Sequence, residues 1–193
     1  MITDIFNSGK KYEIIYADPA WDYKDKCNSG KRGASHKYTT TGLESLMQLP
    51  VAEIAADDCI LFMWHVPPMP QEALDLVAAW GFQFKTMKGF TWVKLNKRAM
   101  TPFMGMGNYT RSNAEDCLIA IKGNPKRLSA KVRSMVFEEQ TELVIAPMTG
   151  HSRKPPEVRD RIVELMGDLP RIELFSRDIV DGWDCWGNHF ETE

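Results

Sequence analysis

Apolar runs with strand composition alternate with helical segments along most of this chain, and this alternation limits the folds open to it. The strand-like runs are Tyr12–Ala17, 59–64, 84–94, 116–122 and 171–175. Helical periodicity covers 42–49, 70–80 and 155–167, with glycine at the end of the last two segments. Strands and helices in this order predict βαβ units around a mostly parallel sheet. Thr41, with Glu44 three residues later, predicts a capping box at the first helix.

The length of 193 residues fits one domain spanning 1–193, with 44% hydrophobic residues to form its core. No apolar run reaches the roughly 20 residues of a membrane helix, and the first residues do not have the pattern of a signal peptide. Four cysteines and four histidines are scattered without ligand spacing. We therefore expect no metal, no disulfide framework, no membrane partner and a cytoplasmic location.

Basic residues are unevenly distributed in a chain whose net charge is −2. The segment from Lys94 to Arg133 holds nine basic residues and two acidic ones, and five further basic residues follow Trp21 before residue 38. Two such segments indicate one positive face that could bind nucleic acid. Each run taken alone is equally compatible with an ordinary solvated surface.

A compact set of chemical groups follows the first predicted strand. Asp18 offers a carboxylate acceptor, the fixed φ of Pro19 directs its carbonyl, and Trp21 offers a flat face for stacking. These groups could hold the exocyclic amine of a planar heterocycle. Because Asp-Pro also starts turns readily, a simple turn is the alternative interpretation.

Long irregular segments follow several of the predicted strands, at 22–40, 96–113 and 123–144. Ligands of open α/β sheets bind beyond the carboxyl ends of the strands, so the first two segments should border such a crevice. Gly30, Gly33 and nearby lysines favour a mobile lid in the first segment.

A second cluster of polar residues lies near the carboxyl terminus. Glu173 interrupts an apolar strand and needs a partner, which could be a ribose diol or a salt bridge to Arg171 or Arg177. Lys154 precedes a helix and could bind a carboxylate or phosphate, or remain solvated. We expect core positions for Trp183 and Trp186. Glycine-rich phosphate loops, Gly-x-Ser-x-Gly and His-Glu-x-x-His are all absent from the sequence, which argues against kinases, dehydrogenases and common hydrolases.

An ordered series of motifs between residues 12 and 189 resembles one enzyme family. The motifs are Asp-Pro-Ala-Trp at 18–21, Leu-Phe-Met-Trp at 61–64, Ala-Trp-Gly-Phe at 79–82, Trp-Val-Lys-Leu-Asn at 92–96, Glu-Asp-Cys-Leu at 115–118 with Lys-Gly-Asn-Pro at 122–125, Ser-Arg-Lys-Pro at 152–155 and Ile-Glu-Leu-Phe-Ser-Arg at 172–177. The chain is similar to the adenine-N6 methyltransferases related to the catalytic subunit of the eukaryotic messenger-RNA N6-adenosine methyltransferase. It looks most like their single-domain bacterial and phage members.

The resemblance implies an α/β, Rossmann-like fold that uses S-adenosylmethionine. The sheet would be mostly parallel, with helices on both faces and a permuted order in which the catalytic motif comes first and the cofactor strand last. The implied catalytic residues are Asp18, Pro19 and Trp21, and the implied cofactor-binding residues are Asp18, Lys154, Glu173, Arg177, Asn188 and His189. His189 stands where a relative has glutamine, and Ala20 replaces the second proline of the family motif, which should soften this loop slightly.

The implied reaction is methyl transfer to the N6 amine of an adenine flipped out of its strand. Candidate substrate-binding residues are Trp21, Lys37, Tyr38, Lys94, Asn96 and Arg111; Tyr38 could instead pack the lid. DNA is the expected polymer, with RNA as an alternative because the chemistry is shared. A non-catalytic nucleic-acid scaffold is a further alternative, since the family includes subunits without the acidic motif. The presence of Asp18, Pro19 and Trp21 favours an enzyme.

Overall fold

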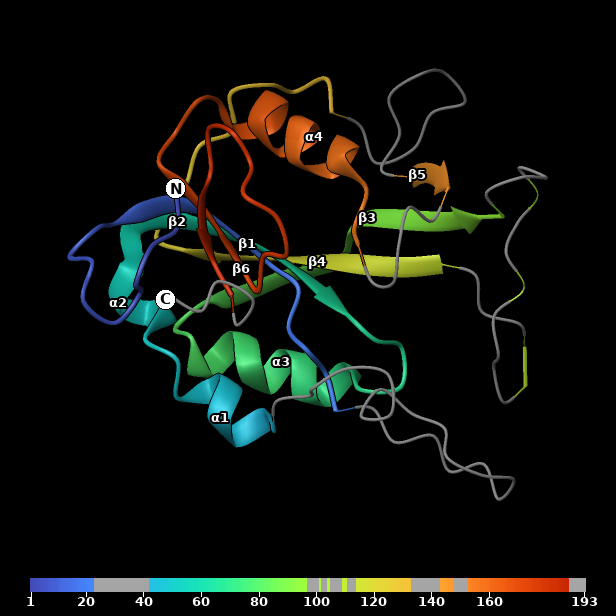
Figure 1. The fold of residues 1–193 in the computed structure, drawn as a ribbon, viewed down its shortest axis with the longest axis horizontal. Coiled ribbons are helices and arrows are strands. Elements are labelled where there is room, and N and C mark those ends of the chain that lie inside the picture. Colours follow the sequence, from blue (N-terminus) through green and yellow to red (C-terminus); the bar gives the residue numbers. More distant parts are fainter. Residues whose placement is uncertain are drawn as a thin grey trace.

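A computed structural model describes residues 1–22, 42–96, 101, 104, 109–110, 114–132, 143–147 and 153–187, the range 143–147 by its backbone. Within these residues the order of elements is β1 (Tyr12–Ala17), α1 (Leu43–Met47), α2 (Val51–Ile54), β2 (Ala55–His65), α3 (Pro70–Ala79), β3 (Gln83–Leu95), β4 (Ala114–Lys122), β5 (Leu143–Pro147), α4 (Pro156–Met166), β6 (Arg171–Leu174) and β7 (Asp184–Trp186). Figure 1 shows these elements, with α4 on one side of the sheet and α1 and α3 on the other.

The described strands form one mixed sheet in the order β5-β3-β4-β2-β1-β6-β7. Neighbours pair in parallel except around β4, which runs antiparallel to both β2 and β3. The sheet is therefore mostly parallel, as the sequence predicts. The exception has a physical reason: no described helix joins β3 to β4, and an antiparallel neighbour needs no crossover helix.

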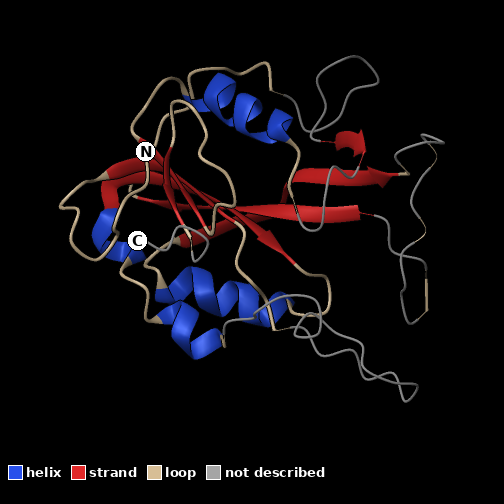
Figure 2. Ribbon diagram, in the orientation of Figure 1, coloured by secondary structure: helices blue, strands red, loops and turns tan. Residues whose placement is uncertain are grey.

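Helices cover both faces of the sheet, as the ribbon coloured by secondary structure also shows (Figure 2). Ile15 and Ala17 of β1 pack toward the layer containing α1 and α3, while Ile14 and Tyr16 pack toward α4. Successive strand residues point to opposite faces, so burial on both faces produces the continuous apolar run seen in β1. The side chains that cover the two faces are Leu46, Leu76, Val77 and Trp80 on one side and Val158, Ile162 and Met166 on the other.

Most of the predicted elements are present, with shifts at their ends. The first strand has its predicted bounds, whereas β2, β3 and β4 are longer than expected. The last predicted strand ends one residue early, because Phe175 adopts a φ of 63° that a strand cannot continue through. The capping box was wrong: Gly42 is the N-cap of α1 and no side chain caps it. Thr41 itself lies outside the described residues.

Three short elements were not predicted, namely α2, β5 and β7. Each has five residues or fewer, too few for a periodic pattern to emerge. The position of β7 depends on tertiary contacts. It pairs with β6, and its Cys185 also bridges to Ile2 at the amino terminus of the chain.

The central strands β1 and β6 lie side by side in parallel, so their carboxyl ends meet at one edge of the sheet. The chain continues from β1 to β2 on one side and from β6 to β7 on the other. Such a reversal of strand order opens a crevice outside the strand ends, which is where open α/β sheets bind their ligands. Asp18 follows β1 directly, and Phe175 follows β6, at this crevice.

Candidate active site

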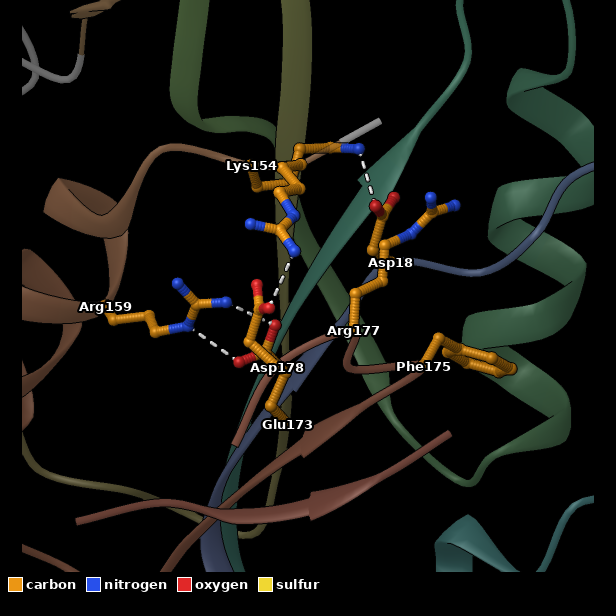
Figure 3. A pocket seen from close by; sticks show the side chains of 8 residues that line it. Asp18, Lys154, Arg159, Glu173, Phe175, Arg177 and Asp178 are labelled. Atoms are coloured by element: carbon orange, nitrogen blue, oxygen red, sulfur yellow. Dashed lines mark hydrogen bonds and ion pairs between the residues drawn. The ribbon is translucent and has the colours of Figure 1, made fainter. Parts of the chain in front are cut away.

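A pocket lies at the carboxyl ends of β1 and β6, and residues just before and within α4 contribute to its lining (Figure 3). Its lining consists of charged side chains and one aromatic ring: Asp18, Arg153, Lys154, Arg159, Glu173, Phe175, Arg177 and Asp178. Four of the predicted site residues, Asp18, Lys154, Glu173 and Arg177, are thus brought together from distant parts of the sequence. Four cationic and three anionic groups make the pocket suited to a polar ligand that carries charges of both signs.

A network of alternating charges holds Asp18 in place. The Lys154 ammonium lies 2.6 Å from Asp18 Oδ2 and 3.3 Å from Glu115 Oε2, so it bridges the ends of β1 and β4. Lys94 of β3 binds the other oxygen of Glu115. Lys154 is only 7% exposed, and its ammonium lies 5.4 Å from the centre of the Trp64 ring, where a cation–π contact adds to the ion pairs.

Burial and charge set the protonation of this network. Burial raises the pKa of the Asp18 carboxyl, and Lys154 offsets this rise only in part. Burial alone would lower the pKa of Lys154, but its two carboxylate partners outweigh burial and raise it. Burial also acts to raise the pKa of Glu115, yet Lys154 and Lys94 bring it down to about 2. Asp18 is therefore the carboxylate of this network that protonates first as the pH falls.

Glu173 has a different partner from those expected. Arg159 of α4 donates from Nε to Oε2 and from Nη2 to Oε1, both at 2.7 Å, in a two-pronged ion pair. Arg171 instead pairs with Asp168, and Arg177 extends from the end of β6 toward Asp18 (Figure 3). The predicted salt bridge of Glu173 to Arg171 or Arg177 is corrected to Arg159. Burial raises the pKa of Glu173, and Arg159 lowers it in part.

The motif after β1 forms a tight turn. The Pro19 carbonyl accepts the Trp21 N–H at 2.9 Å, which closes a γ-turn centred on Ala20. The Trp21 indole N–H donates to the Trp64 carbonyl at 3.0 Å, and the residue as a whole is 4% exposed. Stacking of a base on Trp21 therefore stays a prediction that requires one ring face to be uncovered.

Lys94 and Asn96 lie at the carboxyl end of β3, outside the set of residues that line the pocket. Lys94 joins the network through Glu115, and its ammonium lies 5.1 Å from the centre of the Trp92 ring. The Asn96 amide donates to Thr101 Oγ1 at 3.1 Å. Trp183 is a buried core residue, as expected, and Trp186 is half-buried against the core. Several predicted residues lie outside the described part of the chain: Lys37, Tyr38, Arg111, Asn188 and His189, together with most of the expected lid at 22–40.

The prediction from the sequence did not assign roles to Glu115, Arg153, Arg159, Phe175 or Asp178. Glu115 stood within a quoted motif, but its contact with Lys154 joins residues 39 positions apart. Arg159 follows Val158 in α4, and nothing in helical periodicity shows that its side chain turns toward a strand. Phe175 has a positive φ, a backbone state that the sequence does not reveal. Cys59, Cys117 and Cys185 are free, buried thiols.

A mostly parallel α/β sheet with a charged pocket at its switch point defines a class of proteins that bind nucleotides or related cofactors. A model of the MT-A70 family matches residues 12–189. The type II methyltransferase M.MunI of a Mycoplasma species is 37% identical over 196 residues, covering 92% of this chain and 77% of that protein. The human N(6)-adenine-specific methyltransferase METTL4 is 28% identical, covering 95% of this chain and 38% of its own length. The human N(6)-adenosine-methyltransferase catalytic subunit METTL3 is 25% identical, covering 94% and 28%.

The chain belongs to the MT-A70 family of adenine-N6 methyltransferases, which depend on S-adenosylmethionine. The resemblance seen in the ordered motifs is thereby confirmed. Among the described residues, no helix has the length and apolar character needed to cross a membrane.

Proposed function

We propose that this protein transfers a methyl group from S-adenosylmethionine to the N6 amine of adenine in DNA. One observation carries the proposal: Asp18 lines the pocket, is 21% exposed, is held by Lys154, and is followed directly in the chain by Pro19. The carboxylate and the carbonyl are two acceptors at adjacent residues, which matches the two N–H donors of an exocyclic amine. DNA is favoured by the similarity to the type II methyltransferase M.MunI, which this chain matches over most of both lengths.

The pocket residues fit S-adenosylmethionine, the group that would supply an activated methyl on a sulfonium sulfur. Lys154 and Arg177 offer positive charge to its carboxylate, and Glu173 offers acceptors to the hydroxyls of its ribose. Phe175 adds an apolar surface for the adenine ring. Asn188 and His189 are further cofactor-binding residues implied by the family resemblance, and they lie outside the described residues.

Asp18 and Pro19 would act on the amine during transfer. Accepting the amine hydrogens draws nitrogen lone-pair density out of the ring conjugation and orients it toward the methyl carbon. The nitrogen would gain the methyl group as the bond between that carbon and the sulfonium sulfur breaks, with S-adenosylhomocysteine as the leaving group. The Asp18 carboxylate would offset the positive charge on the nitrogen until one of its protons leaves. The Pro19 carbonyl still has a lone pair for this role, because the Trp21 N–H occupies only one of its two.

RNA is the second candidate polymer, because the relative METTL3 is named as an adenosine methyltransferase. Its similarity to this chain also extends over 94% of the chain. Methyl transfer from labelled S-adenosylmethionine to matched DNA and RNA oligomers, single- and double-stranded, separates the two. We expect label in DNA adenine. Label in RNA alone would overturn the choice of polymer, and label in neither, with the cofactor bound, would favour the scaffold alternative.

We further propose that residues 1–193 act as one methyltransferase domain with a permuted order. The catalytic Asp18 follows the first strand, whereas Glu173 lies on β6 near the end of the chain, which supports this order. Substrate contacts by Lys37, Tyr38, Lys94, Asn96 and Arg111 stay predictions, as does a cytoplasmic location.

A further inference from the structure

The ion pair between Arg159 and Glu173 lines the pocket and joins a helix to a strand. Arg159 comes from the first turn of α4 and Glu173 from the interior of β6, so helix and sheet fix the two ends independently. Both bonds measure 2.7 Å, and the side chains are 14% and 7% exposed. The Arg159 guanidinium also lies 5.9 Å from the centre of the Tyr16 ring. This planar fork holds the Glu173 carboxylate in a single orientation.

The carboxylate still has acceptor capacity when Arg159 is bound. An ionised carboxylate offers about four lone-pair positions, and the two guanidinium bonds occupy one on each oxygen. The remaining positions are available to a ligand in the pocket that Glu173 lines. A pair of neighbouring hydroxyls, one for each oxygen, fits this arrangement.

We propose that Arg159 is a positioning residue, which keeps the Glu173 carboxylate charged and oriented so that it can bind the ribose hydroxyls of S-adenosylmethionine. This inference rests on the proposed function, because it takes the pocket to be the cofactor site. Through Arg159, helix α4 would contribute to recognition of the ribose hydroxyls, a role that the sequence motifs did not indicate. Arg159 would act through Glu173 and need not touch the cofactor itself.

The surroundings of Glu173 explain why a partner is required. Asp18 at the end of β1 and Asp178 after β6 both disfavour a second negative charge nearby, and burial disfavours it further. Tyr16 of β1 and Cys185 of β7 face Glu173 across the sheet pairing. The other charged groups that line the pocket are Arg153, Lys154 and Arg177. Arg153 pairs with Asp178, Lys154 pairs with Asp18, and Arg177 acts electrostatically on Asp18. Arg159 forms the ion pair with Glu173 and is its direct counter-charge.

The test compares binding of S-adenosylhomocysteine and its 2′-deoxy and 3′-deoxy forms to the wild type, Arg159→Met and Arg159→Lys. Calorimetric titration gives each affinity, and Arg161→Met on the same helix is the matched control. In the wild type, removal of a hydroxyl bound to a charged acceptor should weaken binding about tenfold or more. In Arg159→Met this penalty should shrink to about twofold, because the two groups are coupled. Arg159→Lys keeps the charge without the fork and should fall between these values.

The pH dependence of affinity gives a second readout. Without Arg159, the Glu173 carboxylate loses its counter-charge and protonates more readily. The affinity of Arg159→Met should therefore recover only at higher pH, with a midpoint about one pH unit or more above that of the wild type. Arg159→Lys should keep a midpoint near that of the wild type.

Each outcome supports or overturns the inference. A hydroxyl penalty and pH midpoint in Arg159→Met equal to those of the wild type would overturn it, even if that variant were less stable. If Arg159→Met does not fold, an unchanged hydroxyl penalty in Arg159→Lys overturns it instead. A wild-type protein that binds no S-adenosylhomocysteine would overturn the proposed function as well, which distinguishes the two failures.

Discussion

Two carboxylates at neighbouring strand ends, Asp18 and Glu173, are held in opposite ways. Asp18 lies one residue beyond β1, is 21% exposed, and shares a single lysine with Glu115. Glu173 lies within β6, is 7% exposed, and has an arginine fork of its own. Lysine is a compact point charge that can move among partners, whereas the guanidinium fork fixes a carboxylate in one plane.

This difference matches what each group would have to do. A carboxylate that follows a nitrogen through a reaction must adapt as charge develops, and a shared ammonium allows it to do so. A carboxylate that recognises fixed hydroxyls gains from rigidity, since a group held in place loses less entropy on binding. Burial raises the pKa of both carboxyls, so each depends on its cation to stay ionised.

The largest expected effect comes from removing the Asp18 carboxylate, which shares its lysine with Glu115. Asp18→Ala should lower the rate of methyl transfer by about a thousandfold or more, because the acceptor that faces the developing charge is lost. The affinity for S-adenosylhomocysteine should change little, since Glu173 and Lys154 remain. Single-turnover transfer to a DNA oligomer, with calorimetry for the cofactor, measures both quantities.

Asp160→Ala, an exposed change on α4 outside the pocket lining, is the matched control and should keep the wild-type rate. An Asp18→Ala protein that transfers methyl at a rate near that of the wild type would remove Asp18 from the catalytic role and end the contrast with Glu173.

Glu173→Gln should act on binding more than on rate. The amide keeps the shape of the side chain but loses the charge and one acceptor, so the affinity for the cofactor should fall about tenfold to a hundredfold. The maximal rate at saturating cofactor should stay within about threefold of the wild type, because the proposed function assigns contact with the reacting amine to Asp18 and Pro19 and not to Glu173. Steady-state kinetics at several cofactor concentrations separate the two effects, and a loss confined to kcat would contradict the assignment.

The pH dependence of transfer sharpens the comparison further. The raised pKa of Asp18 means that activity should fall as the pH drops and the carboxylate protonates. Glu115 contributes to that raised pKa by like-charge repulsion. Glu115→Gln removes this repulsion and leaves Lys154 to Asp18 alone, so the acidic limb of kcat/KM should move to lower pH. The plateau value of kcat/KM in Glu115→Gln should fall by about tenfold or less. An acidic limb that moves to higher pH would contradict the proposed interaction of Glu115 with Lys154 and Asp18.

The fold was largely predictable because it depends on local patterns. The buried run of β1 and the apolar faces of α3 and α4 are visible as short periodic segments, and their order implies the parallel centre of the sheet. The reversed direction of β4 and the three-residue strand β7 were not predicted, since both depend on which distant strand pairs with them.

The residues that line the pocket were predictable from the sequence where they stand at a strand end, and not where they reach across elements. Asp18 was singled out because it follows an apolar run, Glu173 because it interrupts one, and Lys154 because it precedes a helix. The salt-bridge alternative for Glu173 named the wrong partner, because Arg171 and Arg177 are its neighbours in the sequence whereas Arg159 reaches it from α4. The link from Glu115 to Lys154 likewise exists only after β4 has paired with its neighbours.

The smallest expected effect concerns the flexibility of the turn that follows Asp18. Ala20 occupies the centre of the turn closed by the Trp21 N–H and the Pro19 carbonyl, and its φ is negative, since Phe175 is the non-glycine residue with positive φ in the described chain. A central φ near −75° suits proline, so Ala20→Pro should raise the free energy of unfolding by about 0.5 kcal/mol by restricting the unfolded chain. The transfer rate should stay within about twofold, whereas Ala20→Gly should lower both stability and rate slightly. Thermal unfolding and single-turnover transfer measure the pair of variants.

A loss of about 1 kcal/mol or more in the free energy of unfolding of Ala20→Pro would show that the turn needs the Ala20 N–H or a different φ. The motif would then hold Asp18 in a way that proline cannot reproduce.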